Sequence, residues 1–326
     1  MPDLWPLTID EVLQARTRIQ ERLPPTPLRS YPTLDEEVGY GIRVFVKHEN
    51  HQPTQSFKVR SALAVLTALP VAQRARGVAC ATRGNHGAAL AWAGQLLGIP
   101  VAVCVPRGNN PEKNAAVRGF GAELIEDGQD YDAAVAVADR LVRERGMTLV
   151  HSTNDRNVIA GAATMALEIV EQQPLLDALV LSVGGGSQAV GALTVARAMR
   201  PGLQIFGVQA AGASAIHDSW HAGAPVHGAV ANTFADGLAT RSTYELTFPA
   251  LREGLAGFLK VSEGQIAEGL RLFLRTTHNL AEGAGAAGLA GLLALRESLA
   301  GKSVAVCLSG SNIDASTLRR VLAHEL

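Results

Sequence analysis

The chain has 326 residues, of which 47% are hydrophobic and 18% are charged, and its formal net charge is −1. These values are typical of a globular protein with a substantial core, and they exclude a strongly basic nucleic-acid surface or an acidic tail. Glycines, prolines or charged residues interrupt every apolar run, so no segment is expected to span a membrane.

Short apolar runs alternate with longer amphipathic ones along most of the chain. Strands that alternate with helices indicate βαβ units and mainly parallel sheets. The pattern restarts near residue 155, so we expect an α/β protein of two three-layer domains with mainly parallel twisted sheets and a cleft between them. The expected strands are 42–49, 77–82, 100–106, 122–127, 148–152, 178–183, 204–210 and 302–310, and the expected helices are 57–69, 85–98, 110–121, 131–146, 157–172 and 184–199, the last opened by a glycine loop.

The cysteines and the N-terminus bear on the compartment. Cys80, Cys104 and Cys307 each lie in an apolar, strand-like run, which is typical of buried free thiols, and their spacing indicates no zinc site or disulfide framework. Residues 1–20 lack a basic start followed by an apolar stretch, which argues against a signal peptide. These features predict a cytoplasmic protein.

The first of three glycine-bearing loops that follow predicted strands is ATRGNHGAA, residues 81–89. Ligands of parallel α/β sheets bind at the carboxyl ends of strands, where this loop lies. It opens a predicted helix, and the free N–H groups of a helix N-terminus suit an anion such as a carboxylate. An ordinary capped loop is the alternative.

The second loop, SVGGGSQAVG at 182–191, has three successive glycines before a helix. Such a backbone can wrap an anion, and the helix dipole adds to the attraction. No P-loop lysine follows, and Gln209 or Ala210 stands where a dinucleotide site would have an acidic residue. The loop therefore indicates one phosphate monoester rather than NAD, with a tight turn as the alternative.

The third loop, CLSGSNID at 307–314, follows the last expected strand. Ser309 and Ser311 would present hydroxyl groups to a ligand ring. Helix capping by Ser311 or Asn312 is the alternative.

Lys58 follows Phe57 directly and precedes a predicted helix. Taken alone, it is typical of a solvated surface lysine. The motifs that accompany Lys58 in the sequence are more specific. Six of them occur in one order: SFKVR around Lys58, GNHG at 84–87, GGGS at 184–187, ADG at 235–237, EGAGAAGLA at 282–290 and LSGSNID at 308–314.

From about residue 20 to the C-terminus, this series resembles the fold-type-II pyridoxal-phosphate enzymes, which are tryptophan synthase β-like, and specifically their serine/threonine dehydratase group. The resemblance implies a pyridoxal 5′-phosphate cofactor, a large cofactor-binding domain of residues 1–52 plus 155–326, a small domain of residues 53–154 that carries the substrate-carboxylate loop, and a homodimer. It implies Lys58 as the Schiff-base lysine and catalytic base, Phe57 beside the cofactor, Asn85 on the pyridoxal 3-hydroxyl, Gly184, Gly185, Gly186 and Ser187 around the phosphate, Ser309 at the pyridine nitrogen, and Thr82, Arg83, Gly84 and His86 around the substrate carboxylate.

The sequence departs from the family pattern at several positions. Arg83 stands where the family has a small residue, and where racemases of the family have a serine that acts as second acid/base, so racemisation is disfavoured. Arg83 would pair with a carboxylate or with extra negative charge on a substrate, or else point to solvent. Gln209, with no acid before Asp218, indicates that the divalent-cation site of some relatives is lost, so we expect no metal. Glu282 would contact the cofactor region or cap the following helix, and Gln55 replaces a usual glycine with an unknown effect.

The resemblance implies a lyase that eliminates water from a β-hydroxy amino acid of the L-threonine or L-serine type and releases a 2-oxo acid and ammonia. A modified substrate such as 3-hydroxyaspartate or hydroxyectoine, or β-replacement in the manner of cysteine synthase, is the alternative within this class. A nucleotide-binding oxidoreductase and a non-catalytic pyridoxal-phosphate-binding protein are the alternatives from other classes. No separate regulatory domain, and hence no amino-acid feedback, is expected.

Overall fold

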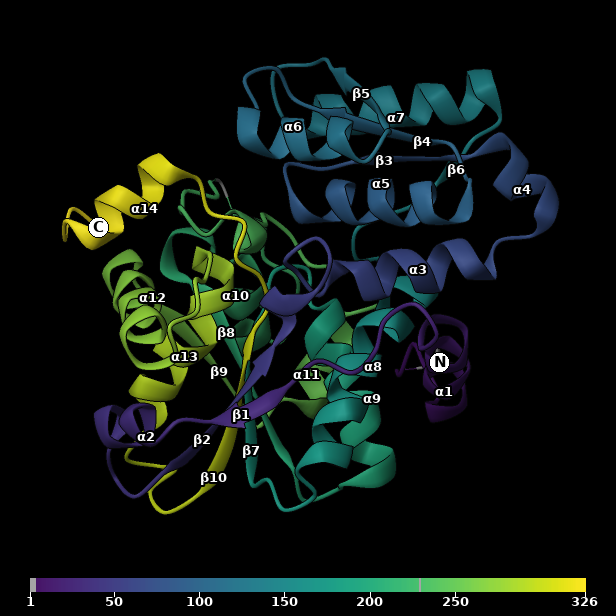
Figure 1. Ribbon diagram of the computed structural model, residues 1–326. Helices are drawn as coiled ribbons and strands as arrows, with labels where there is room; N and C mark the ends of the chain where they lie inside the picture. Colours follow the sequence, from purple (N-terminus) through teal and green to yellow (C-terminus); the bar gives the residue numbers. More distant parts are fainter. Residues whose placement is uncertain (1–3, 229) are drawn as a thin grey trace.

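The computed structural model describes residues 4–228 and 230–326, which form two sheets with helices on both faces of each (Figure 1). The larger sheet has the strand order β1-β2-β10-β7-β8-β9, and every pairing except β1 with β2 is parallel. Its strands are β1 (Leu28–Ser30), β2 (Arg43–His48), β10 (Ser303–Leu308), β7 (Ala178–Ser182), β8 (Gln204–Ala210) and β9 (Gly257–Val261).

The smaller sheet has the order β5-β4-β3-β6 and is parallel throughout. Its central strands are completely buried apolar runs, as expected for strands that helices cover on both faces. The strands are β3 (Val78–Ala81), β4 (Val101–Val105), β5 (Glu123–Glu126) and β6 (Thr148–Leu149).

Helices α12 and α13 cover one face of the larger sheet and α8 and α9 the other, while α5 lies beneath the smaller sheet and α6 and α7 lie above it (Figure 1). The helices are α1 (Ile9–Ile19), α2 (Pro32–Val38), α3 (Lys58–Ala68), α4 (Val71–Arg76), α5 (Asn85–Leu97), α6 (Pro111–Gly119), α7 (Tyr131–Arg145), α8 (Arg156–Gln172), α9 (Ser187–Met199), α10 (Ala215–Ala222), α11 (Phe248–Gly254), α12 (Glu263–Thr277), α13 (Gly283–Leu295) and α14 (Ala315–Leu322), with short 3-10 turns η1 (Glu49–His51), η2 (Ala211–Ala213) and η3 (Asp236–Leu238).

Helix α3 lies between the two sheets and belongs to a core that both share. Leu63 and Leu66 of α3 are fully buried in one apolar cluster with Leu90 of α5 and Ile159 of α8. This continuous core fixes α3, and hence its first residue Lys58, relative to the strand ends of the larger sheet.

The α/β class and the mainly parallel sheets expected from the sequence are confirmed. The strand expected at 148–152 is shorter than expected, because β6 ends at Leu149 and the chain turns at once. The imidazole Nδ1 of His151 accepts the amide protons of Thr153 and Asn154 at 2.9 and 2.7 Å, which closes this turn. None of the helices described is long and apolar enough to cross a membrane. The three cysteines are free and buried.

Candidate functional site

Lys58 lies where the first turn of α3 meets the end of β10. The amide of Phe57 donates to the Ser309 carbonyl at 3.0 Å, and Ser56 forms an isolated bridge with Gly310. These bonds join two segments some 250 positions apart in the sequence, and so they place the expected lysine beside the expected serine. Ser309 is buried, and its hydroxyl donates weakly to the Ala284 carbonyl at 3.5 Å.

Lys58 as a whole is half-buried, and its amine contacts a backbone carbonyl and an aromatic ring. Its Nζ donates to the Ser152 carbonyl at 2.8 Å and lies 5.1 Å from the centre of the Phe57 ring. Burial lowers the pKa of Lys58 to about 8. An amine with this pKa is partly neutral at physiological pH, which a nucleophile or a general base requires.

The glycine loop between β7 and α9 packs against the turn at 151–154, whose Ser152 carbonyl binds Lys58. A Cβ on Gly185 would lie 2.2 Å from Thr153 Oγ1, and a Cβ on Gly184 would lie 2.2 Å from the Gly237 carbonyl oxygen. Gly186 has φ of +97°, a left-handed conformation that disfavours other residues. Only glycine fits these positions, so the loop can present bare backbone and the buried Ser187 at the start of α9 to an anion.

Asn85, at the start of α5, is held between two partners. Its Nδ2 donates to Glu282 Oε1 at 2.6 Å, and its Oδ1 accepts from Asn312 Nδ2 at 2.8 Å. The same Asn312 amide nitrogen donates to the Thr54 carbonyl at 2.8 Å. One N–H of the Asn85 amide has no partner in these contacts and is left for a ligand oxygen such as the pyridoxal 3-hydroxyl.

Glu282 is the buried acid of the site. Burial raises its pKa to about 7, against the opposing charge of Lys113 and the hydrogen bond from Asn85. The residue occupies the cap position of α13, but its side chain makes no capping bond, so the interpretation as a side-chain helix cap is wrong and the contact with the cofactor region stays a prediction. The interpretation of Ser311 or Asn312 as a cap is also wrong, because Asp314 caps α14 by accepting the amide proton of Thr317 at 2.8 Å.

The loop expected to bind the substrate carboxylate lies on the side of the smaller sheet. Thr82 is buried, and its Oγ1 accepts the Gly84 amide proton at 3.1 Å. His86 is buried and its Nε2 donates to the Val150 carbonyl at 3.2 Å, while its Nδ1 has no partner within the described residues. Burial and the charge of Lys58 lower the pKa of His86 to about 3, so its imidazole is neutral. An unpartnered buried nitrogen at this place is available to a ligand.

Arg83 differs from its neighbours because it is exposed, and it makes no hydrogen bond or ion pair among residues 4–228 and 230–326. The structure therefore favours the solvent-facing alternative for the chain without a ligand. Gln55, where a glycine was expected, keeps a left-handed φ of +50°, and its carbonyl accepts the Ser311 amide proton at 2.9 Å. Gln209 is engaged on both ends: its Oε1 accepts the His217 amide proton at 2.9 Å, and its Nε2 donates to Thr240 Oγ1 at 3.2 Å.

Residues that the motifs did not single out complete the site. Ser152 and Thr153 join the lysine to the glycine loop, because Ser152 binds Lys58 and Thr153 packs on Gly185. Lys113 of α6 pairs with Asp236 at 2.6 Å and borders a cavity of about 210 Å³ that Gly84, Asn85 and Asn312 also line. A polar run directly after a strand, HSTND at 151–155, was the one signal available for the first two.

The arrangement fits pyridoxal phosphate. Loop positions without room for a Cβ suit its phosphate, the spare Asn85 amide hydrogen suits its phenolic oxygen, and the Lys58 amine suits its aldehyde. Contacts join these three features. The Ser152 carbonyl accepts from Lys58, and the neighbouring Thr153 packs on Gly185. Asn85 donates to Glu282, whose own amide donates to the Gly310 carbonyl after β10.

Comparisons with known proteins agree with this geometry. The L-threonine ammonia-lyase of Geobacter sulfurreducens is 37% identical over 316 residues, which cover 97% of this chain and 78% of that protein. The L-threo-3-hydroxyaspartate ammonia-lyase of Saccharomyces cerevisiae is 32% identical over 307 residues, 94% of each chain. Maize serine racemase superposes with a TM-score of 0.92 at 30% identity over 98% of both chains.

A family model described as "Pyridoxal-phosphate dependent enzyme" matches residues 19–310, most of the chain. The match includes every motif from SFKVR to the start of LSGSNID. The chain therefore belongs to the family of pyridoxal-phosphate dependent enzymes, within which the relatives compared above are two ammonia-lyases and a serine racemase.

Proposed function

We propose that this enzyme eliminates water from a β-hydroxy α-amino acid of the L-threonine or L-serine type and releases a 2-oxo acid and ammonia. The observation that carries the proposal is the Lys58 amine, whose pKa burial lowers to about 8 and which lies beside a glycine loop and a buried serine. The similarity to L-threonine ammonia-lyase supports the reaction type.

Pyridoxal phosphate, when bound, supplies an aldehyde for the amino group of the substrate and a ring that withdraws electrons from Cα. The residues of the chain would bind and orient the cofactor and move the substrate proton. We assign Gly184, Gly185, Gly186 and Ser187 to the phosphate, Asn85 to the phenolic oxygen and Phe57 to the side of the ring.

Lys58 is the proposed general base. Because its pKa is near 8, a large part of its amine population is neutral near that pH and can accept the α-proton at Nζ. Ser309, at the proposed position of the ring nitrogen, carries no charge and cannot hold a proton there as a carboxylate would. The bound ring would then withdraw electrons less strongly than a ring held protonated at its nitrogen, which suits an elimination.

Thr82, Arg83, Gly84 and His86 are the proposed carboxylate-binding loop. The start of α5 offers free N–H groups to an anion. Because neutral His86 donates from Nε2 to Val150, its unpartnered Nδ1 is an acceptor and would take a proton-bearing group of the ligand rather than the carboxylate. A 3-hydroxyaspartate is the second candidate substrate, since exposed Arg83 is free to pair with a second carboxylate and one relative acts on that compound.

The domain division is also proposed here: residues 1–52 plus 155–326 hold the cofactor, and residues 53–154 carry the carboxylate loop. We further propose a homodimer in the cytoplasm. Three buried free thiols support a reducing compartment. Light scattering of the purified protein measures the oligomeric state.

A substrate panel tests the proposed function. The purified protein with added pyridoxal phosphate is incubated with L-threonine, L-serine and L-threo-3-hydroxyaspartate, and ammonia and 2-oxo acid are measured. We expect equal amounts of both products from at least one of them. A product that incorporates an added thiol would indicate β-replacement instead, and no turnover despite bound cofactor would indicate a binding protein.

A further inference from the structure

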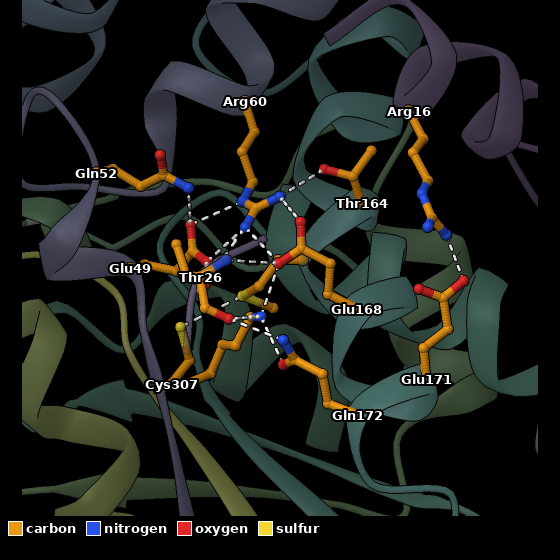
Figure 2. Close-up of polar contacts among 12 residues, drawn as sticks. Arg16, Thr26, Glu49, Gln52, Arg60, Thr164, Glu168, Glu171, Gln172 and Cys307 are labelled. Carbon is orange, nitrogen blue, oxygen red and sulfur yellow. Dashed lines mark hydrogen bonds and ion pairs between the residues drawn. The ribbon is translucent and has the colours of Figure 1, made fainter. Parts of the chain in front are cut away.

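A cluster of buried charges joins β2, η1, α3 and α8 (Figure 2). Lys47 of β2, Glu49 of η1, Arg60 of α3 and Glu168 of α8 are each at most 6% exposed. We call these four residues the buried charge network. It holds two cations and two carboxylates, so its formal charges cancel, and the proposed chemistry uses none of them.

Every nitrogen of the two cations has a partner. Arg60 makes a two-pronged contact with Glu49 through Nε and Nη2 at 2.8 Å each, and a second with Glu168 through Nη1 at 2.6 Å and Nη2 at 2.8 Å. Lys47 Nζ donates to Glu168 at 2.7 Å. Hydroxyl, carbonyl and amide oxygens of neighbouring residues accept the remaining bonds: Thr26, Thr164 and Gln172.

Stability alone is a poor explanation for this arrangement. Burying four charges carries a desolvation cost, and apolar side chains of similar volume often stabilise a protein as well or better. A paired guanidinium does add a fixed geometry, because its planar, forked N–H groups donate to a carboxylate in one orientation only. A fork held from both η1 and α8 therefore fixes the helix that carries it.

That helix begins without a cap. Phe57 provides no side-chain bond to the start of α3, so nothing from the preceding loop holds its first turn through the usual capping contact. Arg60 follows Lys58 by two residues, about 200° around the helix axis, so the two side chains leave α3 in opposite directions. Arg60 binds Glu168 on one side of α3, and Lys58 binds the Ser152 carbonyl on the other side.

The backbone of α8 packs closely against α3 and leaves α3 little room to rotate. A Cβ on Gly161 of α8 would lie 2.5 Å from the Arg60 carbonyl oxygen, so α3 and α8 touch at this level. Ser61 Oγ also donates to the Val158 carbonyl of α8 at 2.8 Å. A rotation of α3 would break the forked contacts of Arg60 and would move the Lys58 amine away from the Ser152 carbonyl.

We propose that Arg60, held by Glu49 and Glu168, is a positioning residue that sets the rotation of α3 and thereby holds the Lys58 amine in the cleft. This inference rests on the role assigned to Lys58 in the proposed function. It predicts that loosening the fork changes the environment of Lys58 even when the protein stays folded.

The test titrates Lys58 directly in the cofactor-free chain. Acetic anhydride labels neutral amines, and mass spectrometry of the Lys58 peptide follows the labelling from neutral to alkaline pH. The wild type should show a midpoint near pH 8. His86 and His151 also face Lys58, and burial and its charge lower both of their pKa values, so neither gains charge in this range.

Two variants loosen the fork. Arg60→Lys keeps the charge and removes the forked geometry, and Arg60→Met with Glu49→Gln removes one charge of each sign. In both we expect water to reach the amine and the midpoint to rise by about one unit toward that of an ordinary lysine, which lowers the neutral fraction of Lys58, and hence its labelling at pH 8, about fivefold. Circular dichroism checks the fold, and Arg60→Lys decides the outcome if the double variant unfolds.

Arg16→Met is the matched control. Arg16 pairs with Glu171 of α8 near the network, but the pair is half-exposed and joins α1 rather than α3 (Figure 2). Its loss should leave the Lys58 midpoint unchanged. An unchanged midpoint in folded Arg60→Lys, or an equal shift in Arg16→Met, would overturn the proposal. Failure of the wild type to take up pyridoxal phosphate would instead sink the proposed function and would leave this titration result standing.

Discussion

The two walls of the cleft are built differently. On the wall formed with the larger sheet, Lys58 is bound by the Ser152 carbonyl. The Gly237 backbone leaves no room for a Cβ at Gly184, and the Thr153 side chain leaves none at Gly185. On the wall formed with the smaller sheet, Arg83 is exposed and the buried His86 has an unpartnered nitrogen.

This contrast has a chemical meaning. A cofactor held in every turnover needs a preorganised cradle, whereas a loop that receives changing substrates needs unsatisfied groups that a ligand completes. We therefore expect substitutions on the first wall to remove cofactor binding and chemistry, and substitutions on the second to change which substrate is preferred.

The largest effect is expected from Lys58→Ala. Without its amine the site loses both the covalent anchor and the proposed base, so ammonia release should fall at least about a thousandfold. Retained helical circular dichroism shows that the fold survives. Activity within tenfold of the wild type would contradict the role of Lys58.

Gly185→Ala should damage the phosphate cradle. The new Cβ would lie 2.2 Å from Thr153 Oγ1, so the loop or the turn at 151–154 must shift. We expect the affinity for pyridoxal phosphate, measured by absorbance titration, to fall about a hundredfold, and stability to fall by about 1–3 kcal/mol. Gly202→Ala is the control, because its Cβ would meet nothing within 4 Å.

Glu282 links the two walls through Asn85 and should make stability depend on pH. Its pKa is raised from 4.5 to about 7 in the fold, so between these values the folded chain binds more protons than the unfolded one. Unfolding free energy should therefore fall as pH rises from about 4.5 to 7 and then level off, by roughly 3 kcal/mol at most. Urea unfolding of the cofactor-free wild type and of Glu282→Gln over this pH range isolates the contribution of Glu282 to the unfolding free energy. The same pH slope in both proteins would refute it.

Arg83→Ala should have the smallest effect, and a selective one. An exposed side chain that binds no partner within residues 4–228 and 230–326 contributes little to folding, so stability should change by less than about 0.5 kcal/mol. If Arg83 pairs with a second carboxylate, kcat/KM for L-threo-3-hydroxyaspartate should fall about tenfold or more while that for L-threonine stays within about threefold. An equal fall for both substrates would place Arg83 on the carboxylate that all of them share.

Sequence reasoning found the elements that carry strong periodicity and the motifs that carry chemistry. The helix 85–98 and the strand 204–210 match α5 and β8 within one residue. It gave no bounds for α12 or α13, although it expected a helix directly after Glu282. Helix α13 is apolar on every side, so it shows no amphipathic face. Helix α12 does carry readable signals, a capping box at Ser262 and Gln265 and one apolar face, and sequence reasoning missed them.

Contacts between distant segments were beyond reach. Nothing local to Glu168 indicates that it meets Arg60 across more than a hundred residues, and nothing local to Ser152 indicates that its backbone oxygen holds Lys58. Backbone acceptors carry no sequence signature, and a buried carboxylate looks like a surface one until its partner is known. The same limit applies to the loop at 82–86, because Arg83 binds no other described residue and its role depends on the ligand.

The central claim is that Lys58 forms the covalent link to pyridoxal phosphate. Borohydride reduction of the protein incubated with the cofactor, followed by digestion and mass spectrometry, tests it most directly. The account predicts one phosphopyridoxyl group, located on Lys58. A colourless protein without the modification, or a modification located on another lysine, would contradict it.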